Sequence, residues 1–541
     1  MTLRPLLLAA LLAALVPCGA HAELPAQVAQ LAHAAGIPEE AIGALVMRGD
    51  TILVANQEDQ PMLPASTMKV VTAVVALEEL GPAFRARTEL RSKGSIVNGT
   101  LKGDLIVRGG ADLDFNEDTL THLLERLRAQ GVRKVAGDLV LDRQLFQPPR
   151  ADVGLPPFDD APEAYYNVIP DALLLNMNML RIDMEATGKG VKAAALPELD
   201  SVTVRSEQKL IDGDCANWED GWQPPTQVRT GRTLTVVLHG TFPRGCRQTY
   251  AVNVLDRDDY ADRLIRATFK RLGGTIAGRT RTVDLAEHTS TLTAAAVAEG
   301  TLGGDAPAPQ ASGTDSDGSR LLAFHASRAL PEIVRDTMKV SDNAFARTLY
   351  LTLGSLLPDP VLGSRPLPAG QRLAMLMAAR GQGTPGGGEE AGMPTSTAAR
   401  AEQVVRGWFK RHDIDDTGMV LENGAGLSRN ERLQPVQLAA VLRAAQKSLW
   451  APEFQASLPI VGVDGTMRRR LKDSTAATRA RIKTGTLRNG VAVAGYVPDA
   501  NGEPCIVVAI INHDNMDNSV GRGIVDALID WTAKSSAGDA M

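Results

Sequence analysis

A serine and a lysine three residues apart, Ser66 and Lys69, are the first candidates for catalytic chemistry in this chain. They lie in the stretch 64–82, which begins with proline, continues through a valine-rich run and ends in Gly81-Pro82. This pattern predicts one buried helix. Residues three apart share a helix face, so the two side chains can meet. A neutral lysine can take the hydroxyl proton of such a serine and make it a nucleophile.

The Ser-x-x-Lys pattern is weakly specific by itself. A second copy, Ser206 with Lys209, occurs in a polar, strand-like context, where the ordinary interpretation is a surface serine near a solvated lysine. Two further motifs follow Ser66 in order. Ser341-Asp-Asn343 lies between two predicted helices, and Lys483-Thr-Gly485 lies on a predicted strand. The order of the motifs and the element that each occupies together predict a serine acyl-transfer site.

Acyl transfer requires a base and a path for the proton to the leaving nitrogen. We expect burial and the nearby cation Lys483 to lower the pKa of Lys69, so that the amine can act as the base. The Ser341 hydroxyl can pass the proton on. The Asn343 side chain can bond both a substrate amide and the Lys69 amine.

The third motif suits the binding of a peptide end. Lys483 and Thr484 can hold a terminal carboxylate, and Gly485 lets a substrate backbone approach an edge strand because it has no Cβ. The backbone N–H groups of Ser66 and Thr486 are the expected oxyanion hole, which stabilises the negative charge of the tetrahedral intermediate.

Composition and the N-terminal sequence restrict the class of protein. A net charge of −6 and 4% aromatic residues give no indication of nucleic-acid binding. Residues 1–22 have the form of a secretory signal, with Arg4, a short apolar run and Ala20-His-Ala22 as the cleavage site. The run is too short to span a bilayer, and no later run is long enough. We therefore expect an exported protein, cleaved after Ala22, with at most loose membrane association.

Three cysteines follow the predicted cleavage site. Cys215 and Cys246 are predicted to form a disulfide in an oxidising compartment, and Cys505, in an apolar run, is predicted to be a buried thiol. The eight histidines show no metal-ligand spacing with cysteines or carboxylates. We expect neither a metal nor another cofactor.

With these motifs the chain resembles the class C low-molecular-mass penicillin-binding proteins, the DacB-type D-alanyl-D-alanine carboxypeptidase/endopeptidases. Besides the motifs, the approach to Ser341 from Ile333, the segment Asn423-Gly-Ala-Gly-Leu-Ser-Arg429, Leu458–Gly462 and Asp464-Gly-Thr466 resemble stretches of the family. The long separation between the first two motifs is also a family trait. Class A β-lactamases lack it, and no Glu-x-x-x-Asn follows Ser341 to supply their deacylating carboxylate.

The resemblance implies an α+β fold of the penicillin-binding-protein and serine β-lactamase type, an antiparallel sheet flanked by helices. The catalytic domain would be discontinuous, formed by residues 23–87 and 320–535. Short strands from 88 to 300 would form two mostly β inserted domains, followed by a flexible loop at 301–319. A Gly- and Pro-rich insertion at 358–397 and Ala425, where the family has serine, are departures, and neither is expected to touch the three motifs.

The resemblance also implies a periplasmic enzyme that acts on peptidoglycan stem peptides. It would remove terminal D-alanine or cut the D-alanyl–diaminopimelate crosslink through an acyl-enzyme at Ser66, which β-lactam antibiotics would trap. Asp160 (or Asp159) and Arg429 would bind the free end of diaminopimelate. Two alternatives stay open: a β-lactamase or esterase on the same fold, and a non-catalytic penicillin sensor or wall-binding scaffold.

Overall fold

The computed structural model of the chain describes residues 23–299, 317–381, 394–514 and 516–536. The predicted signal peptide, most of the predicted loop at 301–319 and part of the stretch 358–397 lie outside these ranges. In the described ranges, no helix combines the length and the apolar character needed to cross a bilayer.

A five-stranded antiparallel sheet unites the two ends of the chain. Its strand order is β2-β1-β23-β22-β21, so the N-terminal hairpin lies beside strands from the C-terminal part. In the pairing of β1 with β23, Ile42 lies opposite Ile511. These strands are β1 (Ile42–Arg48), β2 (Thr51–Asn56), β21 (Arg481–Leu487), β22 (Gly490–Pro498) and β23 (Pro504–Asn512).

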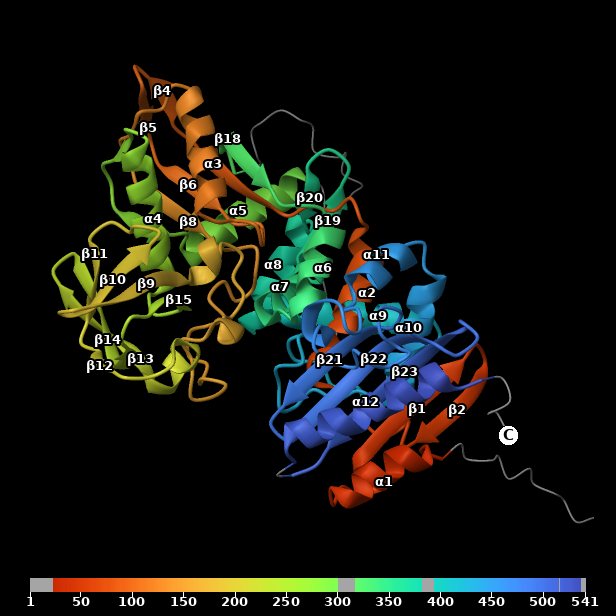
Figure 1. Cartoon of the computed structure of the whole chain (residues 1–541). Helices are drawn as coiled ribbons and strands as arrows, with labels where there is room; N and C mark the ends of the chain where they lie inside the picture. Colours follow the sequence, from red (N-terminus) through yellow and green to blue (C-terminus); the bar gives the residue numbers. More distant parts are fainter. Residues whose placement is uncertain (1–22, 300–316, 382–393, 515, 537–541) are drawn as a thin grey trace, which may run out of the picture.

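Helices cover both faces of this sheet (Figure 1). On one face, α1 (Ala26–Ala34) and α12 (Asn518–Lys534) share an apolar core with the strands. The opposite face packs against α2 (Met68–Leu80) and α10 (Pro435–Lys447). The remaining helices of this part are α6 (Leu330–Val340), α7 (Asn343–Leu353), α9 (Thr397–Arg411) and α11 (Ala451–Ser457).

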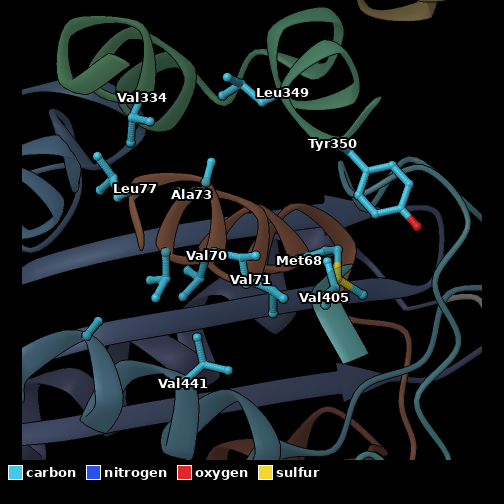
Figure 2. Packing of buried hydrophobic residues seen from close by; sticks show 14 of the residues in the cluster. Met68, Val70, Val71, Ala73, Leu77, Val334, Leu349, Tyr350, Val405 and Val441 are labelled. Atoms are coloured by element: carbon cyan, nitrogen blue, oxygen red, sulfur yellow. The ribbon is translucent and has the colours of Figure 1, made fainter. Parts of the chain in front are cut away.

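The helix α2 lies at the centre of the part of the molecule built around this sheet, and most of its residues are buried. All residues from Met68 to Leu77 are buried, as expected for a helix that is apolar all round. Figure 2 shows Ala73 and Leu77 directed toward α6 and α7, with Val441 of α10 on the other side. One helix was expected from residue 64 on, but a 3-10 turn at Ala65–Thr67 precedes α2.

A β-rich region leaves this part of the molecule after α2 and returns before α6. Its first and last strands, β3 and β18, pair antiparallel in the sheet β17-β8-β6-β3-β18. A second sheet has the order β16-β7-β5-β4. The strands are β3 (Arg87–Ser92), β4 (Ser95–Val97), β5 (Thr100–Lys102), β6 (Leu105–Arg108), β7 (Lys134–Val135), β8 (Leu139–Asp142), β16 (Thr275–Ile276), β17 (Thr280–Thr282) and β18 (Arg320–Ala326). The helices are α3 (Glu117–Ala129), α4 (Arg257–Arg271) and α5 (Leu285–Ala298).

Two further sheets occupy the middle of the inserted region. One has the order β10-β9-β15, and in the other β14 pairs with β11, β12 and β13. Cys215 and Cys246 form a disulfide here, with their Cα atoms 5.6 Å apart, and Cys505 is a buried free thiol. The strands are β9 (Leu180–Thr187), β10 (Gly190–Leu196), β11 (Val202–Ser206), β12 (Lys209–Ile211), β13 (Trp222–Thr230), β14 (Thr233–Pro243) and β15 (Arg247–Val252).

The stretch 358–397, expected as a Gly- and Pro-rich surface insertion, contains regular structure in its described part. A hairpin is formed by β19 (Leu356–Asp359) and β20 (Gly363–Pro366), and the helix α8 (Ala369–Ala379) follows. Leu373 and Leu376 of α8 share a small apolar core with α5 of the inserted region. The prolines before α8 suggested a loop, but they are compatible with the start of a helix.

Candidate active site

The Ser66 turn lies between the edge strand β21 and the segment 422–427. A Cβ added to Gly485 of β21 would lie 2.9 Å from the Ser66 nitrogen, so the strand touches the turn. On the other side, a Cβ on Gly426 would lie 1.7 Å from the Ala65 carbonyl oxygen. Ala65 itself has a positive φ of 47°, which is unusual for a residue with a side chain. Close packing therefore holds Ser66 in one place at the start of α2.

The Lys69 amine is fully buried and touches three oxygens. Its Nζ lies 2.9 Å from Ser66 Oγ, 2.7 Å from Asn343 Oδ1 and 2.6 Å from the Ala425 carbonyl oxygen. Asn343 Oδ1 and the Ala425 oxygen can only accept hydrogen bonds. A neutral amine has two N–H groups for these two acceptors, which directs its lone pair at the Ser66 hydroxyl. This geometry suits a base that takes the proton of Ser66.

Burial lowers the pKa of Lys69 to about 7, because the charged form loses its hydration. The nearby carboxylates Glu431 and Asp342 oppose this shift, and the guanidinium of Arg347 adds to it. The expected burial lowers the pKa of Lys69, but the cation that adds to this shift is Arg347, where Lys483 was expected. Burial, and after it repulsion by the charge of Lys69, lower the pKa of Lys483 far below its usual range.

Ser341 joins the second motif to the third. It ends α6 in a left-handed conformation, with φ 61° and ψ 42°, and its Oγ accepts a hydrogen bond of 2.8 Å from Lys483 Nζ. The same Nζ donates to the Thr484 carbonyl oxygen at 2.6 Å. Asp342 then caps α7 by accepting from the N–H of Phe345. The abrupt turn between the two helices thus brings the Ser341 hydroxyl to the buried amine of β21.

Thr484 and Thr486 project at the edge of β21. The Thr484 hydroxyl donates to Thr466 Oγ1 at 2.8 Å, and Thr486 is exposed. Together with the preceding contacts, these positions bring all residues of the three predicted motifs around the Ser66 turn. Ser206 and Lys209 lie elsewhere, on β11 and β12 of the inserted region, where the Ser206 hydroxyl bonds to Gln208.

The sequence matches one family model over most of its length. The model of the Peptidase_S13 family, described as the D-Ala-D-Ala carboxypeptidase 3 (S13) family, matches residues 24–299 and 387–535. The chain belongs to the D-Ala-D-Ala carboxypeptidase 3 (S13) family. Membership identifies it as a serine peptidase, and the family resemblance stated from the motifs is confirmed.

Curated relatives of this S13 chain include two bacterial carboxypeptidases. It is 28% identical to D-alanyl-D-alanine carboxypeptidase DacB of Haemophilus influenzae over 467 residues, 83% of this chain and 80% of that protein. It is 27% identical to a D-alanyl-D-alanine carboxypeptidase of an Actinomadura species over 472 residues, 85% of this chain and 75% of that protein.

Among solved structures, penicillin binding protein 4 from H. influenzae matches 94% of this chain and 99% of its own, with a TM-score of 0.68 and 24% identity. A structure of the same protein in complex with a β-lactam matches with a TM-score of 0.64, 22% identity, and coverage of 94% and 100%. The predicted fold class is confirmed: an α+β penicillin-binding fold with a β-rich region inserted between the first two motifs.

A segment of the inserted region contacts the second motif of this S13 site. Tyr165 donates a hydrogen bond of 2.5 Å to Asp342 Oδ2, and Asn343 Nδ2 lies 3.3 Å from the Tyr166 carbonyl oxygen. Val168 accepts a hydrogen bond from Arg347 of α7. The segment 165–168 therefore borders the candidate site, although it is distant from the second motif in sequence.

Arg429 and the acidic candidates for the diaminopimelate end lie near this segment, and within the described residues each of Arg429 and Asp159 has a different hydrogen-bond partner. Arg429 donates to the Phe158 carbonyl oxygen at 3.1 Å, and its guanidinium carbon lies 5.2 Å from the Phe158 ring centroid. Asp159 accepts from the Tyr166 hydroxyl at 2.8 Å, and its charge interacts with that of Arg429. Asp160 is exposed. Of the two acidic candidates, Asp159 is the one whose charge interacts with Arg429.

Sequence reasoning missed three contributors to the site: the Tyr165 hydroxyl, the Glu431 carboxylate and the Ala425 carbonyl. The expectation that Ala425 does not touch the motifs is wrong, because its backbone oxygen accepts a hydrogen bond from Lys69. A serine or an alanine can supply that oxygen equally well, which explains how the site tolerates this departure from the family pattern. Residue types give no signal for a backbone contact of this kind.

Proposed function

We propose that the protein is a serine-type D-Ala-D-Ala carboxypeptidase, a D-alanyl–diaminopimelate endopeptidase, or both, acting on peptidoglycan stem peptides. The single observation that carries this proposal is the contact of 2.9 Å between Lys69 Nζ and Ser66 Oγ in a site where burial favours the neutral amine. Membership of the S13 family supports the same reaction class.

In the proposed reaction, Lys69 takes the Ser66 proton while Oγ attacks the carbonyl carbon of the penultimate D-alanine. The backbone N–H groups of Ser66 and Thr486 stabilise the resulting oxyanion. The proton then passes to the leaving amine by way of Ser341, which accepts a hydrogen bond from Lys483. The amine departs and leaves an acyl-enzyme. Water, activated by the same base, releases the shortened peptide.

Substrate recognition is assigned to side chains around the nucleophile. Asn343 bonds the substrate amide, Lys483 and Thr484 hold the terminal carboxylate of a carboxypeptidase substrate, and Gly485 leaves room for the peptide backbone. Asp159 and Arg429 are proposed to bind the free end of diaminopimelate. The predicted signal at 1–22 supports a periplasmic location, where these peptides occur.

The test is the intact mass of the mature protein after brief incubation with benzylpenicillin, in parallel with Ser66→Ala. A β-lactam opens on the nucleophile and remains attached, so one lasting adduct is expected in the wild type and none in the variant. Rapid loss of the drug without an adduct would support the β-lactamase alternative. If the protein forms no adduct and the drug is not lost, the non-catalytic scaffold is favoured.

Release of D-alanine from a pentapeptide, and cleavage of a crosslinked dimer, then separate the two proposed activities. Ser66→Ala is expected to abolish both. Activity that survives in this variant would show that Ser66 is not the nucleophile.

A further inference from the structure

A buried carboxylate, Glu431, lies behind the general base and has no part in the reaction as described above. Its side chain is 0% exposed. One oxygen, Oε1, accepts three backbone hydrogen bonds, from the N–H groups of Glu422 at 3.2 Å, Asn423 at 2.9 Å and Gly424 at 2.9 Å. Burial raises the pKa of the Glu431 carboxyl, and the three backbone hydrogen bonds oppose this shift because they favour the anion. The other oxygen, Oε2, is buried without a hydrogen-bond partner among the described residues.

The backbone turn that Glu431 binds lies directly against α2. Gly424 O accepts a hydrogen bond of 2.6 Å from the Thr72 hydroxyl, and Ala425 O accepts one of 2.6 Å from Lys69 Nζ. The next residue, Gly426, packs on the Ala65 carbonyl so closely that a Cβ would lie 1.7 Å from it. A shift of this turn would therefore change the acceptor on Lys69 and the packing of the Ser66 turn together.

We propose that Glu431 is a positioning residue for the general base. By binding the N–H groups of residues 422–424, it holds the Ala425 carbonyl on the Lys69 amine, so that the lone pair of the neutral amine points at Ser66. This inference rests on the proposed serine peptidase reaction. Glu431 touches neither Ser66 nor the substrate groups, and it acts only through the turn and through its charge.

The charge of Glu431 gives this role a measurable second effect. Among the groups around Lys69, Glu431 and Asp342 favour the protonated amine, whereas Arg347 and burial disfavour it. Lys483 faces Lys69 from β21, and Glu422 belongs to the turn that Glu431 binds and repels the Glu431 charge. The pKa of Lys69, about 7, is the balance of these effects, so removal of the Glu431 charge lowers it further.

The experiment compares the pH dependence of the rate of acylation by benzylpenicillin in Glu431→Gln and Glu431→Asp. Glu431→Gln keeps the size of the side chain and removes the charge, so the acidic limb of the profile is expected to move about one pH unit toward lower pH. Glu431→Asp keeps the charge but is one methylene shorter. We expect its limb to stay near the wild-type position while its plateau rate falls about tenfold, because the turn is no longer held.

Glu422→Gln is the matched control. This carboxylate lies on the same turn, but its Oε2 accepts from Ser428, and its charge is absent from those that act on Lys69. Its profile is expected to overlay that of the wild type. A Glu431→Gln profile with an unmoved limb would overturn the electrostatic role, and an unchanged plateau in Glu431→Asp would overturn the positioning role.

Two measurements separate these outcomes from other failures. Thermal unfolding identifies a variant that does not fold. If one Glu431 variant fails to fold, the acylation profile of the other variant tests the role of Glu431. If the wild type itself forms no adduct, the proposed peptidase reaction fails and not only the role of Glu431. Both Glu431 variants overlaying the wild type at every pH, in a protein that does acylate, would make Glu431 a structural residue only.

Discussion

Two sets of buried basic side chains in this molecule have different hydrogen-bond partners. In the active site, the Lys69 and Lys483 amines bond to hydroxyl, amide and carbonyl oxygens, and neither forms an ion pair within the described residues. In the inserted region, Arg143 and Arg257 share the carboxylate of Asp171, at 2.7 and 3.2 Å, and the Asp171 side chain is 0% exposed.

The difference in partners changes the ionisation of each group. Burial lowers the pKa of Lys69 because neutral acceptors do not replace its hydration. Burial also opposes the charge of Arg143, but Asp171 and Asp258 outweigh it, and the pKa of Arg143 is raised. Burial thus favours the neutral form of an amine whose direct partners are neutral oxygens, whereas a buried guanidinium paired with carboxylates stays charged.

The strongest test of this contrast makes the base permanently charged. Lys69→Arg introduces a guanidinium that stays protonated at any working pH, so it cannot accept the Ser66 proton. The acylation rate with benzylpenicillin, followed by intact mass, is expected to fall about 10³-fold. A fall of less than about tenfold in a folded variant would contradict the assignment of Lys69 as base.

The reverse test removes a paired cation. Arg143→Met leaves Asp171 with the cation Arg257 and the N–H of Leu173 as partners. We expect the inserted region to lose about 3–5 kcal/mol of stability, because a buried carboxylate is then incompletely compensated. Urea unfolding measures this loss. Below the unfolding transition, the acylation rate should stay within about twofold of the wild type, and a large kinetic defect without destabilisation would refute the division of roles.

The pH dependence of the wild-type acylation rate tests the same contrast, with a smaller expected effect. In the proposed reaction only neutral Lys69 accepts the proton, and its pKa is about 7, so the acylation rate should fall about tenfold per pH unit below 7 and level off above about 8. The folded pKa lies below the unfolded value of 10.5, so the unfolded chain binds the extra proton between these values. The Lys69 contribution to stability therefore rises with pH across that interval. A flat rate profile from pH 5 to 8 would exclude this base.

The smallest effect is expected where only a side chain changes and the backbone acceptor stays. Ala425→Ser restores the residue typical of the family and keeps the carbonyl on Lys69, so the acylation rate should change less than about threefold. The new hydroxyl enters a fully buried position, which we expect to lower stability by about 1 kcal/mol. A large gain in rate would show that the side chain at 425, and not its carbonyl, serves the base.

The sequence was sufficient to predict the parts of the site that depend on residue type. Ser66, Ser341 and Lys483 each lie in a short motif on a predictable element, and their order in the chain indicated that they meet. The disulfide between Cys215 and Cys246 likewise followed from the number of cysteines and the expected compartment.

Other features depend on tertiary contacts that leave no local pattern. The Ala425 carbonyl and the hydrogen bonds of Glu431 involve backbone atoms, which every residue type shares. Tyr165 meets Asp342 only because the inserted region folds back on the catalytic part. The short helix α8 was missed because its stability comes from packing on α5, while its flanking prolines suggested a loop.

The pairing of β1 with β23 has a consequence for synthesis of the chain. Ser66 and Lys69 leave the ribosome early, but Lys483 and the strands on which α2 rests are made near the end. Until then α2 can pack on α6, α7, α9 and α10, but its sheet-facing side lacks the strands and the proposed proton relay lacks Lys483. A chain that terminates before β21 would therefore lack Lys483 and the edge strand beside Ser66, and hydrolytic activity is expected only from a chain that includes β21.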